Sequence, residues 1–402
     1  MAKPEIRLKG FEGEWKRHSL EECLSISNER NTNKKFGRED VLSVSDDFGV
    51  VNQIKFLGRS YAGADLSGYK IVRPGQVIYT KSPLRFKPFG IIKENQKENG
   101  IVSVLYAVYN VSNNLNSSFV DLYFAPSYRT NNYLLPLISK GAKNTINISD
   151  ENALKGTFHF PIVDEQKSIT EYFKSLDSML QSTAKKIESL KQMKSACLVS
   201  MFPQAGETTP RVRFKGFEGE WVKDKAVNLF MTFNERNRPD LPVLSANQDI
   251  RGMAPRSDTG YTISHNKANE VTYKVVKPGQ YVIHLRSFQG GFAHSAVEGI
   301  TSPAYTVFGF KNLNLHDDYF WKIIFMSKSF IKSLETITYG IRDGRSISFS
   351  EFSEMSFLFP SKQEQQKIST YFRSLDMQIS LQEQKLEKLK QIKAACLDKM
   401  FV

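Results

Sequence analysis

Basic and amide side chains are concentrated in segments that differ between the two halves of the sequence. Arginine can bind guanine through two hydrogen bonds, asparagine and glutamine suit adenine, and lysine suits phosphate. Any one of these residues is more often a solvated surface charge, so the prediction of DNA contact rests on the group, and we expect fewer than half of its members to touch DNA. The candidates are Arg59, Tyr61, Lys81, Arg85, Lys87, Lys143 and Asn144, then Arg251, Arg256, Arg286, Gln289, Arg342 and Arg345.

The net charge of the chain favours the same kind of partner. It is +13 at pH 7, with an isoelectric point near 9.4. Clustered Lys and Arg displace counterions from a polyphosphate, so nucleic acid, and double-stranded DNA in particular, is the leading candidate. Charge alone leaves open a soluble basic protein whose charges are scattered.

Motifs for nucleotide, methyl-donor or metal chemistry are missing from the sequence. There is no Gly-x-Gly-x-x-Gly turn and no Gly-Lys-Ser/Thr phosphate loop. Without a Pro-Pro dipeptide, the Asn/Asp-Pro-Pro-aromatic signature of amino-methylating enzymes is excluded. Pro239-Asp240 meets no Asp/Glu-x-Lys pattern before residue 383, which argues against a metal-dependent nuclease. We therefore predict no catalytic residue in this chain.

Three histidines of the second half are candidate metal ligands by residue type. They lack supporting cysteines and a repeated spacing, so we interpret them as fold or surface histidines and predict no metal site. They are His265, His284 and His294.

The composition is that of a folded protein. The chain has 402 residues, of which 40% are hydrophobic and 24% charged, and this predicts two or three domains. No secretory signal and no apolar membrane span are visible, so we expect a cytoplasmic protein with no membrane partner. Cys23, Cys197 and Cys396 match neither a disulfide framework nor a paired-cysteine zinc site, and are interpreted as reduced structural thiols.

The elements that must position the candidate contacts occur twice. KGFEGEW stands at residues 9–15 and again at 215–221, within a longer match of 7–31 to 213–237. A second stretch, 160–202, aligns without gaps on 359–401 with roughly half of the positions identical. The chain is therefore a tandem duplication whose middle segments have diverged.

The tail of each copy predicts a long helix with one apolar seam. The spacing alternates between four and three residues, and neither tail contains Gly or Pro after its opening Phe-Pro. We favour antiparallel pairing of the two helices, with Lys194 opposite Gln382 and Lys393 opposite Thr183; coverage of each helix by its own domain is the alternative. The seam residues are Ile169, Phe173, Leu176, Leu180, Ile187, Leu190 and Lys194, repeated as Ile368, Phe372, Leu375, Ile379, Leu386, Leu389 and Lys393.

The bodies that precede the tails predict an α+β fold. Strands are expected at 41–45, 76–80, 102–111, 281–285 and 304–310, and helices near 131–138 and 318–330. Pro-Gly at 74–75 and 278–279 predicts a tight turn before the same strand in each copy. The expected domains are a first body (1–163), a first helix (164–202), a linker (203–212), a second body (213–362) and a second helix (363–402).

This pattern resembles the specificity subunit (HsdS) of type I restriction-modification systems. Each helix opens with Phe-Pro, then Glu-Gln, Ile and Leu-Asp, and each body opens with Gly-Phe-x-Gly-x-Trp. The motif residues are Phe160, Pro161, Glu165, Gln166, Ile169, Leu176 and Asp177, repeated as Phe359, Pro360, Glu364, Gln365, Ile368, Leu375 and Asp376. The resemblance covers essentially the whole chain.

The resemblance implies two pseudo-symmetric target recognition domains separated by two long antiparallel coiled-coil helices. Each domain would read one half of an asymmetric, two-part DNA site, and the helices would fix the gap. Two methyltransferase subunits carrying S-adenosylmethionine would methylate adenine at N6. Motor and restriction subunits using Mg²⁺ and ATP would cleave unmodified DNA. No cofactor is expected in this chain.

The sequence leaves two alternative classes of function, a stand-alone enzyme and a protein-binding adaptor. A stand-alone nuclease or methyltransferase conflicts with the missing motifs. A non-catalytic coiled-coil adaptor that binds only protein would leave the charge excess and the divergent bodies unexplained. Salt-sensitive binding of DNA would discriminate against the adaptor.

Overall fold

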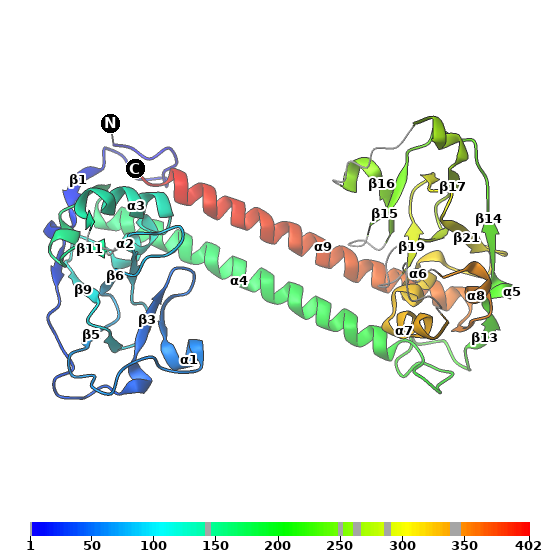
Figure 1. The fold of residues 1–402 in the computed structure, drawn as a ribbon, viewed down its shortest axis with the longest axis horizontal. Coiled ribbons are helices and arrows are strands. Elements are labelled where there is room, and N and C mark those ends of the chain that lie inside the picture. Colours follow the sequence, from blue (N-terminus) through cyan, green and yellow to red (C-terminus); the bar gives the residue numbers. More distant parts are fainter. Residues whose placement is uncertain (1, 141–145, 248–251, 260–266, 285–290, 338–346) are drawn as a thin grey trace. The chain divides into compact units, whose positions relative to one another are not determined.

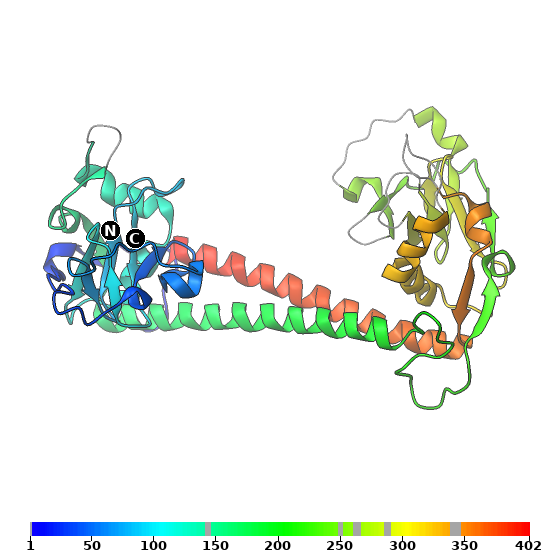
Figure 2. The same ribbon diagram turned by 60° about the horizontal axis from the view of Figure 1, so that its bottom comes forward.

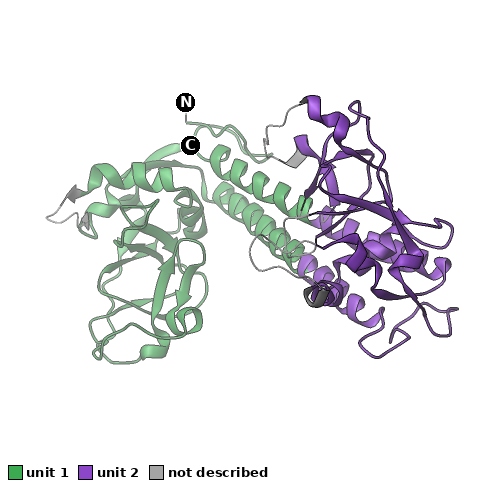
Figure 3. Ribbon diagram, turned by 45° about the vertical axis from the view of Figure 1, so that its right-hand side comes forward, with its two compact units in different colours: residues 1–185, 383–402 green, residues 186–382 purple. Residues whose placement is uncertain are grey.

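The computed structural model describes residues 2–140, 146–247, 252–259, 267–284, 291–337 and 347–402. These form two compact units (Figure 3): unit 1 contains residues 1–185 and 383–402, and unit 2 contains residues 186–382. Each unit thus combines one body with the beginning of one long helix and the end of the other.

Unit 1 is built around a four-stranded antiparallel sheet in the order β2-β9-β6-β7. Unit 1 also contains four separate two-stranded sheets: β1-β12, β3-β4, β5-β8 and β10-β11. The strands are β1 (Lys16–Ser19), β2 (Leu24–Ile26), β3 (Leu42–Ser45), β4 (Gly49–Asn52), β5 (Lys70–Val72), β6 (Val77–Thr80), β7 (Ile91–Glu94), β8 (Gly100–Val102), β9 (Tyr106–Val111), β10 (Ser139–Lys140), β11 (Ile146–Asn147) and β12 (Thr157–Phe160). The short helices are α1 (Gln53–Leu57), α2 (Ser117–Tyr123) and α3 (Ser127–Leu134).

Unit 2 repeats the central sheet of unit 1 and extends it. The order β14-β21-β18-β19 corresponds to β2-β9-β6-β7, and β16 and β15 are added beside β19, with β16 parallel to it. The strands are β13 (Val222–Lys225), β14 (Phe230–Phe233), β15 (Leu244–Asn247), β16 (Gly252–Pro255), β17 (Lys274–Val276), β18 (Tyr281–Ile283), β19 (Phe292–Ser295), β20 (Gly299–Thr301), β21 (Thr306–Phe310) and β22 (Ser356–Phe359). The short helices are α5 (Ala226–Leu229), α6 (Asp318–Met326), α7 (Lys328–Ile337) and α8 (Phe349–Ser353).

The α+β prediction is confirmed, and two of the expected elements are each divided in the structure. The expected strand 102–111 is two strands, β8 and β9, because residues 103–105 form a turn. The expected helix 318–330 is likewise divided into α6 and α7 at Ser327. The Pro-Gly turns are as predicted: Gly75 and Gly279 have φ of +86° and +83°, a backbone conformation that favours glycine.

The two long helices are α4 (Val163–Ser200) and α9 (Lys362–Lys399), and the predicted seam residues along them are buried or half-buried. In unit 1 the start of α4 runs antiparallel to the end of α9 (Figures 1 and 2), with Tyr172 Oη 3.5 Å from Cys396 Sγ. In unit 2 the end of α4 pairs with the start of α9 in the same sense, and Cys197 Sγ lies 3.4 Å from Tyr371 Oη. The antiparallel pairing is confirmed within each unit.

The predicted register of this pairing is wrong. In unit 1 Lys393 Nζ lies 2.5 Å from Asp177 Oδ1, and in unit 2 Lys194 pairs with Asp376. Each seam lysine therefore faces the aspartate of the repeated Leu-Asp pair instead of Thr183 or Gln382. A half-buried ammonium is better compensated by a carboxylate than by a hydroxyl or an amide.

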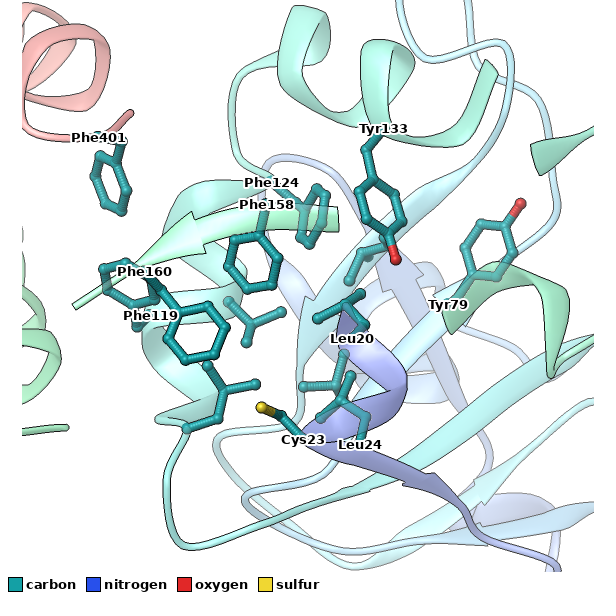
Figure 4. Packing of buried hydrophobic residues seen from close by; sticks show 14 of the residues in the cluster. Leu20, Cys23, Leu24, Tyr79, Phe119, Phe124, Tyr133, Phe158, Phe160 and Phe401 are labelled. Carbon is teal, nitrogen blue, oxygen red and sulfur yellow. The ribbon is translucent and has the colours of Figure 1, made fainter. Parts of the chain in front are cut away.

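The core of each body contains the end of the helix that begins in the other unit. In unit 1, Phe401 packs on Trp15, Phe119 and Phe173, and Figure 4 shows its ring on the same side of the cluster as Phe119 of α2 and Phe160 of β12. In unit 2, Phe202 stacks on Phe320 with ring centroids 5.6 Å apart. Neither body completes its core from its own segment of sequence alone.

The repeated opening and helix-start motifs fasten each body to its helix. Gln166, near the start of α4, accepts a hydrogen bond from the backbone N of Asn116, the N-cap of α2, at 2.8 Å. In unit 2 Gln365 accepts the equivalent bond from Asp317, the N-cap of α6, at 3.0 Å. The duplicated residues therefore build one mounting for two different bodies.

Candidate nucleic-acid interface

Exposed arginine and aromatic side chains form pairs on loops of unit 1. The guanidinium of Arg59 lies 4.6 Å from the ring centroid of Tyr61, and that of Arg85 lies 5.1 Å from the ring of Phe86. Gln53 of α1 fixes the first pair, because its Oε1 accepts a hydrogen bond from the backbone N of Tyr61 at 3.0 Å. Such pairs offer a cation for phosphate or guanine and a flat ring for stacking.

A third exposed aromatic group was not found from the sequence. Phe48, in the turn between β3 and β4, lies against Phe56 of α1 with ring centroids 5.0 Å apart, and Phe48 is 61% exposed. The available signal was a phenylalanine inside the turn sequence DDFG at 46–49, where a solvent-facing residue is expected. Phe48 and Phe56 are thus a further exposed apolar pair of unit 1.

Lys87 is a correction to the predicted contacts. It is 1% exposed, and its ammonium donates to Asp46 Oδ1 at 2.6 Å and to the carbonyl oxygens of Phe124 and Ala125 at 3.2 and 2.9 Å. Burial lowers the pKa of Lys87, and Asp46 opposes that shift. With its donors used inside the fold, Lys87 has no surface from which to contact a phosphate.

Lys81 is also held by the fold. Its ammonium donates to the carbonyl of Ile148 at 2.7 Å and lies 3.0 Å from Asp150, which pairs with Lys70 as well. Although burial opposes it, hydrogen bonds from the two lysines keep the pKa of Asp150 below its ordinary value. Lys81 is a quarter exposed, so its role as a DNA contact stays a prediction.

In unit 2 the structure describes one predicted contact. Arg256, at the end of β16, is half-buried and donates from Nε to Ser245 Oγ at 3.2 Å. The others lie outside the described residues, as do two from unit 1. They are Lys143, Asn144, Arg251, Arg286, Gln289, Arg342 and Arg345.

A charged network surrounds the junction of α6 with the start of α9. His294 Nε2 lies 2.6 Å from Asp318 Oδ2, the guanidinium of Arg373 lies 4.3 Å from the ring centroid of Tyr319, and the Tyr319 hydroxyl donates to Asp376 at 2.6 Å.

The other two histidines considered as metal ligands are His284 and His265. Burial lowers the pKa of His284, and His265 lies outside the described residues. The described residues contain no group of three His, Cys, Asp or Glu arranged to hold a metal ion.

A cavity of about 720 Å³ in unit 2 lies between the second KGFEGEW motif and the start of α9. Its walls carry Arg213, Glu218, Lys311 and Lys362, while His316 is buried at its edge. Burial lowers the pKa of His316 to about 4, so this imidazole is neutral near pH 7.

Comparison with known proteins relates the second half of the chain to one family. A family model of the type I restriction modification DNA specificity domain matches residues 222–391, which comprise most of the second body and of α9.

No described helix has the length and apolar character of a membrane-spanning segment. A search of curated protein sequences gave no significant match.

Two solved structures share the fold over nearly the whole chain. The HsdS subunit from Thermoanaerobacter tengcongensis is 15% identical, with 96% of each chain covered and a TM-score of 0.50. The type I restriction-modification system S subunit from M. genitalium is 12% identical, with 100% of this chain and 99% of that chain covered and a TM-score of 0.55.

Proposed function

We propose that this chain, which belongs to the type I restriction-modification DNA specificity family, is the subunit that selects the DNA sequence on which such a system acts. One observation supports this proposal above the others. The contacts that fasten each body to its helix are repeated, including the bonds of Gln166 and Gln365 to the N-caps of α2 and α6, whereas the candidate reading loops differ. A duplicated frame with unlike loops suits the recognition of two unlike half-sites.

The proposed target is an asymmetric, two-part site in double-stranded DNA. Side chains that contact base edges set the sequence, while contacts to phosphate set the position of a reader on the duplex. In the first body the exposed pairs Arg59–Tyr61 and Arg85–Phe86 have the chemistry for both tasks. The second body, with its own sheet extension of β15 and β16, would read the other half.

The two long helices would set the gap between the half-sites and provide docking surfaces for partners. The proposed partners are two methyltransferase subunits, which would supply S-adenosylmethionine and methylate adenine at N6. Restriction and motor subunits, with Mg²⁺ and ATP, would act on unmodified DNA. This chain would contribute recognition without catalysis.

The first experiment is a genome-wide map of N6-methyladenine by single-molecule sequencing, in the host with the gene, without it, and with it restored. Loss of one asymmetric, two-part methylated motif on deletion, and its return on restoration, is the expected result. If no motif disappears although the partner subunits are expressed, the proposal fails. The adaptor that binds only protein would then be the better explanation.

A further inference from the structure

Lys87 has the lowest exposure of any lysine or arginine among the described residues of unit 1, at 1%. Burying a lysine is unfavourable unless its charge and its donors are matched. Lys87 meets this requirement with three acceptors from two distant parts of the chain: Asp46, and the carbonyl groups of Phe124 and Ala125. The lysine therefore joins three segments at one point.

The first of these segments is the loop that carries Lys87 itself, residues 81–90. Its backbone is closed by reciprocal hydrogen bonds between Leu84 and Lys87 at 3.0 and 3.2 Å, and the Phe86 carbonyl accepts from Asn131 of α3 at 3.1 Å. At the end of the loop, Gly90 has φ +102°, and a Cβ there would lie 2.0 Å from the Thr80 carbonyl oxygen. The loop is thus held at both ends.

The second segment leads back to the long helix. Phe124 and Ala125 directly follow α2, so Lys87 also satisfies carbonyl groups at the C-terminal end of that helix. The other end of α2 is fixed on α4, because the N of Asn116 donates to Gln166. A continuous set of contacts therefore runs from α4, through α2, to Lys87.

The third segment is the turn between β3 and β4, which Asp46 ties to Lys87. Two residues after Asp46 comes Phe48, which rests on Phe56, and next to Lys87 comes Phe86, which is 70% exposed. The ion pair of buried Lys87 with half-buried Asp46 thus fixes two loops that each present an exposed phenylalanine ring. Arg85 beside Phe86 adds a positive charge that suits DNA.

We propose that Lys87 is a positioning residue for DNA recognition by the first body. It holds the Phe48 turn and the Arg85–Phe86 loop together, so that both contact the same half-site of double-stranded DNA. Exposed rings flanked by arginine can stack on a base or wedge between base steps. This inference rests on the proposed function, and it names the residues with which the first body reads DNA.

The structure supplies a matched control for this proposal. Lys93 is another buried lysine of the same body, and it pairs with Asp121 at 3.0 Å between β7 and α2. Lys93→Met removes a similar ion pair whose hydrogen bond joins β7 to α2 and reaches neither loop, whereas Lys87→Met and Asp46→Ala release the loops. Asp46→Ala further separates the two roles of Lys87, since it leaves the bonds to the Phe124 and Ala125 carbonyls in place.

The test is the N6-methyladenine map of the host carrying the full-length gene with Lys87→Met, Asp46→Ala, Phe86→Ala, Phe48→Ala or Lys93→Met. With the first four variants, sites altered by one base in one half-site should gain methylation roughly fivefold or more relative to the cognate site. The other half-site and the gap should stay unchanged. Lys93→Met should keep the original motif, even if total methylation falls.

Three outcomes would overturn the proposal. Lys87→Met and Lys93→Met could lower methylation equally with the motif intact, which would make Lys87 purely structural. If Lys87→Met relaxes the recognised motif but Asp46→Ala leaves it unchanged, the Lys87–Asp46 ion pair does not hold the two loops together. Uniform loss of methylation with Phe86→Ala, together with weaker co-purification of the methyltransferase subunit, would make the surface a protein-docking site.

Failure of the proposed function is visible separately in these experiments. In that case the host with the wild-type gene shows no methylated two-part motif, so no variant can change the methylation of a half-site. If Lys87→Met prevents folding, the exposed residues Phe48 and Phe86 still test the surface, and Asp46→Ala still tests the tie. An unaltered motif with all three of these variants would refute the proposal.

Discussion

Arg7 binds Glu165 through two parallel hydrogen bonds of 2.7 Å, Nε to Oε1 and Nη2 to Oε2, and Arg213 repeats both bonds with Glu364 at the same distances. The Glu165 side chain is 2% exposed. Arg7 also donates to the carbonyl of Gly13, so the pair folds the opening motif of the body onto the start of α4. The hydrogen bond to Glu165 raises the pKa of Arg7, so the arginine stays charged at any physiological pH.

Glu165→Gln should destabilise unit 1 by about 3 kcal/mol, because it leaves a partly buried guanidinium without its counter-charge. Hydrogen exchange followed by mass spectrometry can resolve the two units, and peptides of β6 and β9 should lose protection while those of β18 and β21 keep it. Glu14→Gln, in the same motif but exposed, is the control. Equal protection in both variants would show that the ion pair contributes little.

Phe401→Ala should destabilise unit 1 by roughly 3 kcal/mol, since it removes a buried ring and leaves a cavity among Trp15, Phe119 and Phe173. Phe202→Ala should do the same to unit 2, where Phe202 packs on Trp221 and Phe320. Limited proteolysis should then cut within unit 1 for the first variant and within unit 2 for the second. The exposed Met377→Ala is the control, and a reversed or common cutting pattern would contradict the assignment of each helix end to its core.

His316 should make the stability of unit 2 depend on pH. Its pKa is lowered to about 4 by burial, and its Nδ1 has no hydrogen-bond partner among the described residues. In the unfolded chain a histidine has a pKa near 6.5, so it binds a proton more readily than the buried His316 does. The contribution of neutral His316 to the free energy of unfolding is therefore fully present above pH 6.5 and is lost as the pH falls toward 4. Between pH 7 and pH 5 the loss should be about 2 kcal/mol.

His316→Leu tests the sign of this dependence. In unit 1 the corresponding position, before the N-cap Asn116, is the buried Leu115, so a leucine fits this place in the repeated frame. Chemical denaturation of unit 2 at pH 5 and pH 7 should differ less in this variant than in the wild type. If the substitution leaves the pH dependence unchanged, the dependence belongs to other groups, such as Asp318, whose pKa is lowered.

The sequence predicts the repeated parts of the molecule well because their signals are local. Heptad spacing locates α4 and α9, and Pro-Gly before a β-branched run locates β6 and β18. Lys87 shows where local signals end. It stands in the stretch RFKPF, which is typical of an exposed basic loop, yet its acceptors lie about forty residues away on both sides. The register of the long helices was missed for the same reason, since Asp177 and Asp376 select it from the opposite helix.

Lengthening both long helices by one heptad should widen the gap of the recognised site. Duplicating residues 180–186 and 379–385 preserves the four-three spacing of the seam, and seven residues add about 10 Å. At about 3.4 Å for each base pair, the methylated motif should keep both half-sites with a gap about three base pairs longer. Duplication in one helix alone puts the antiparallel seam out of register and should abolish methylation. If the double insertion is active but leaves the gap unchanged, the helices do not set the spacing.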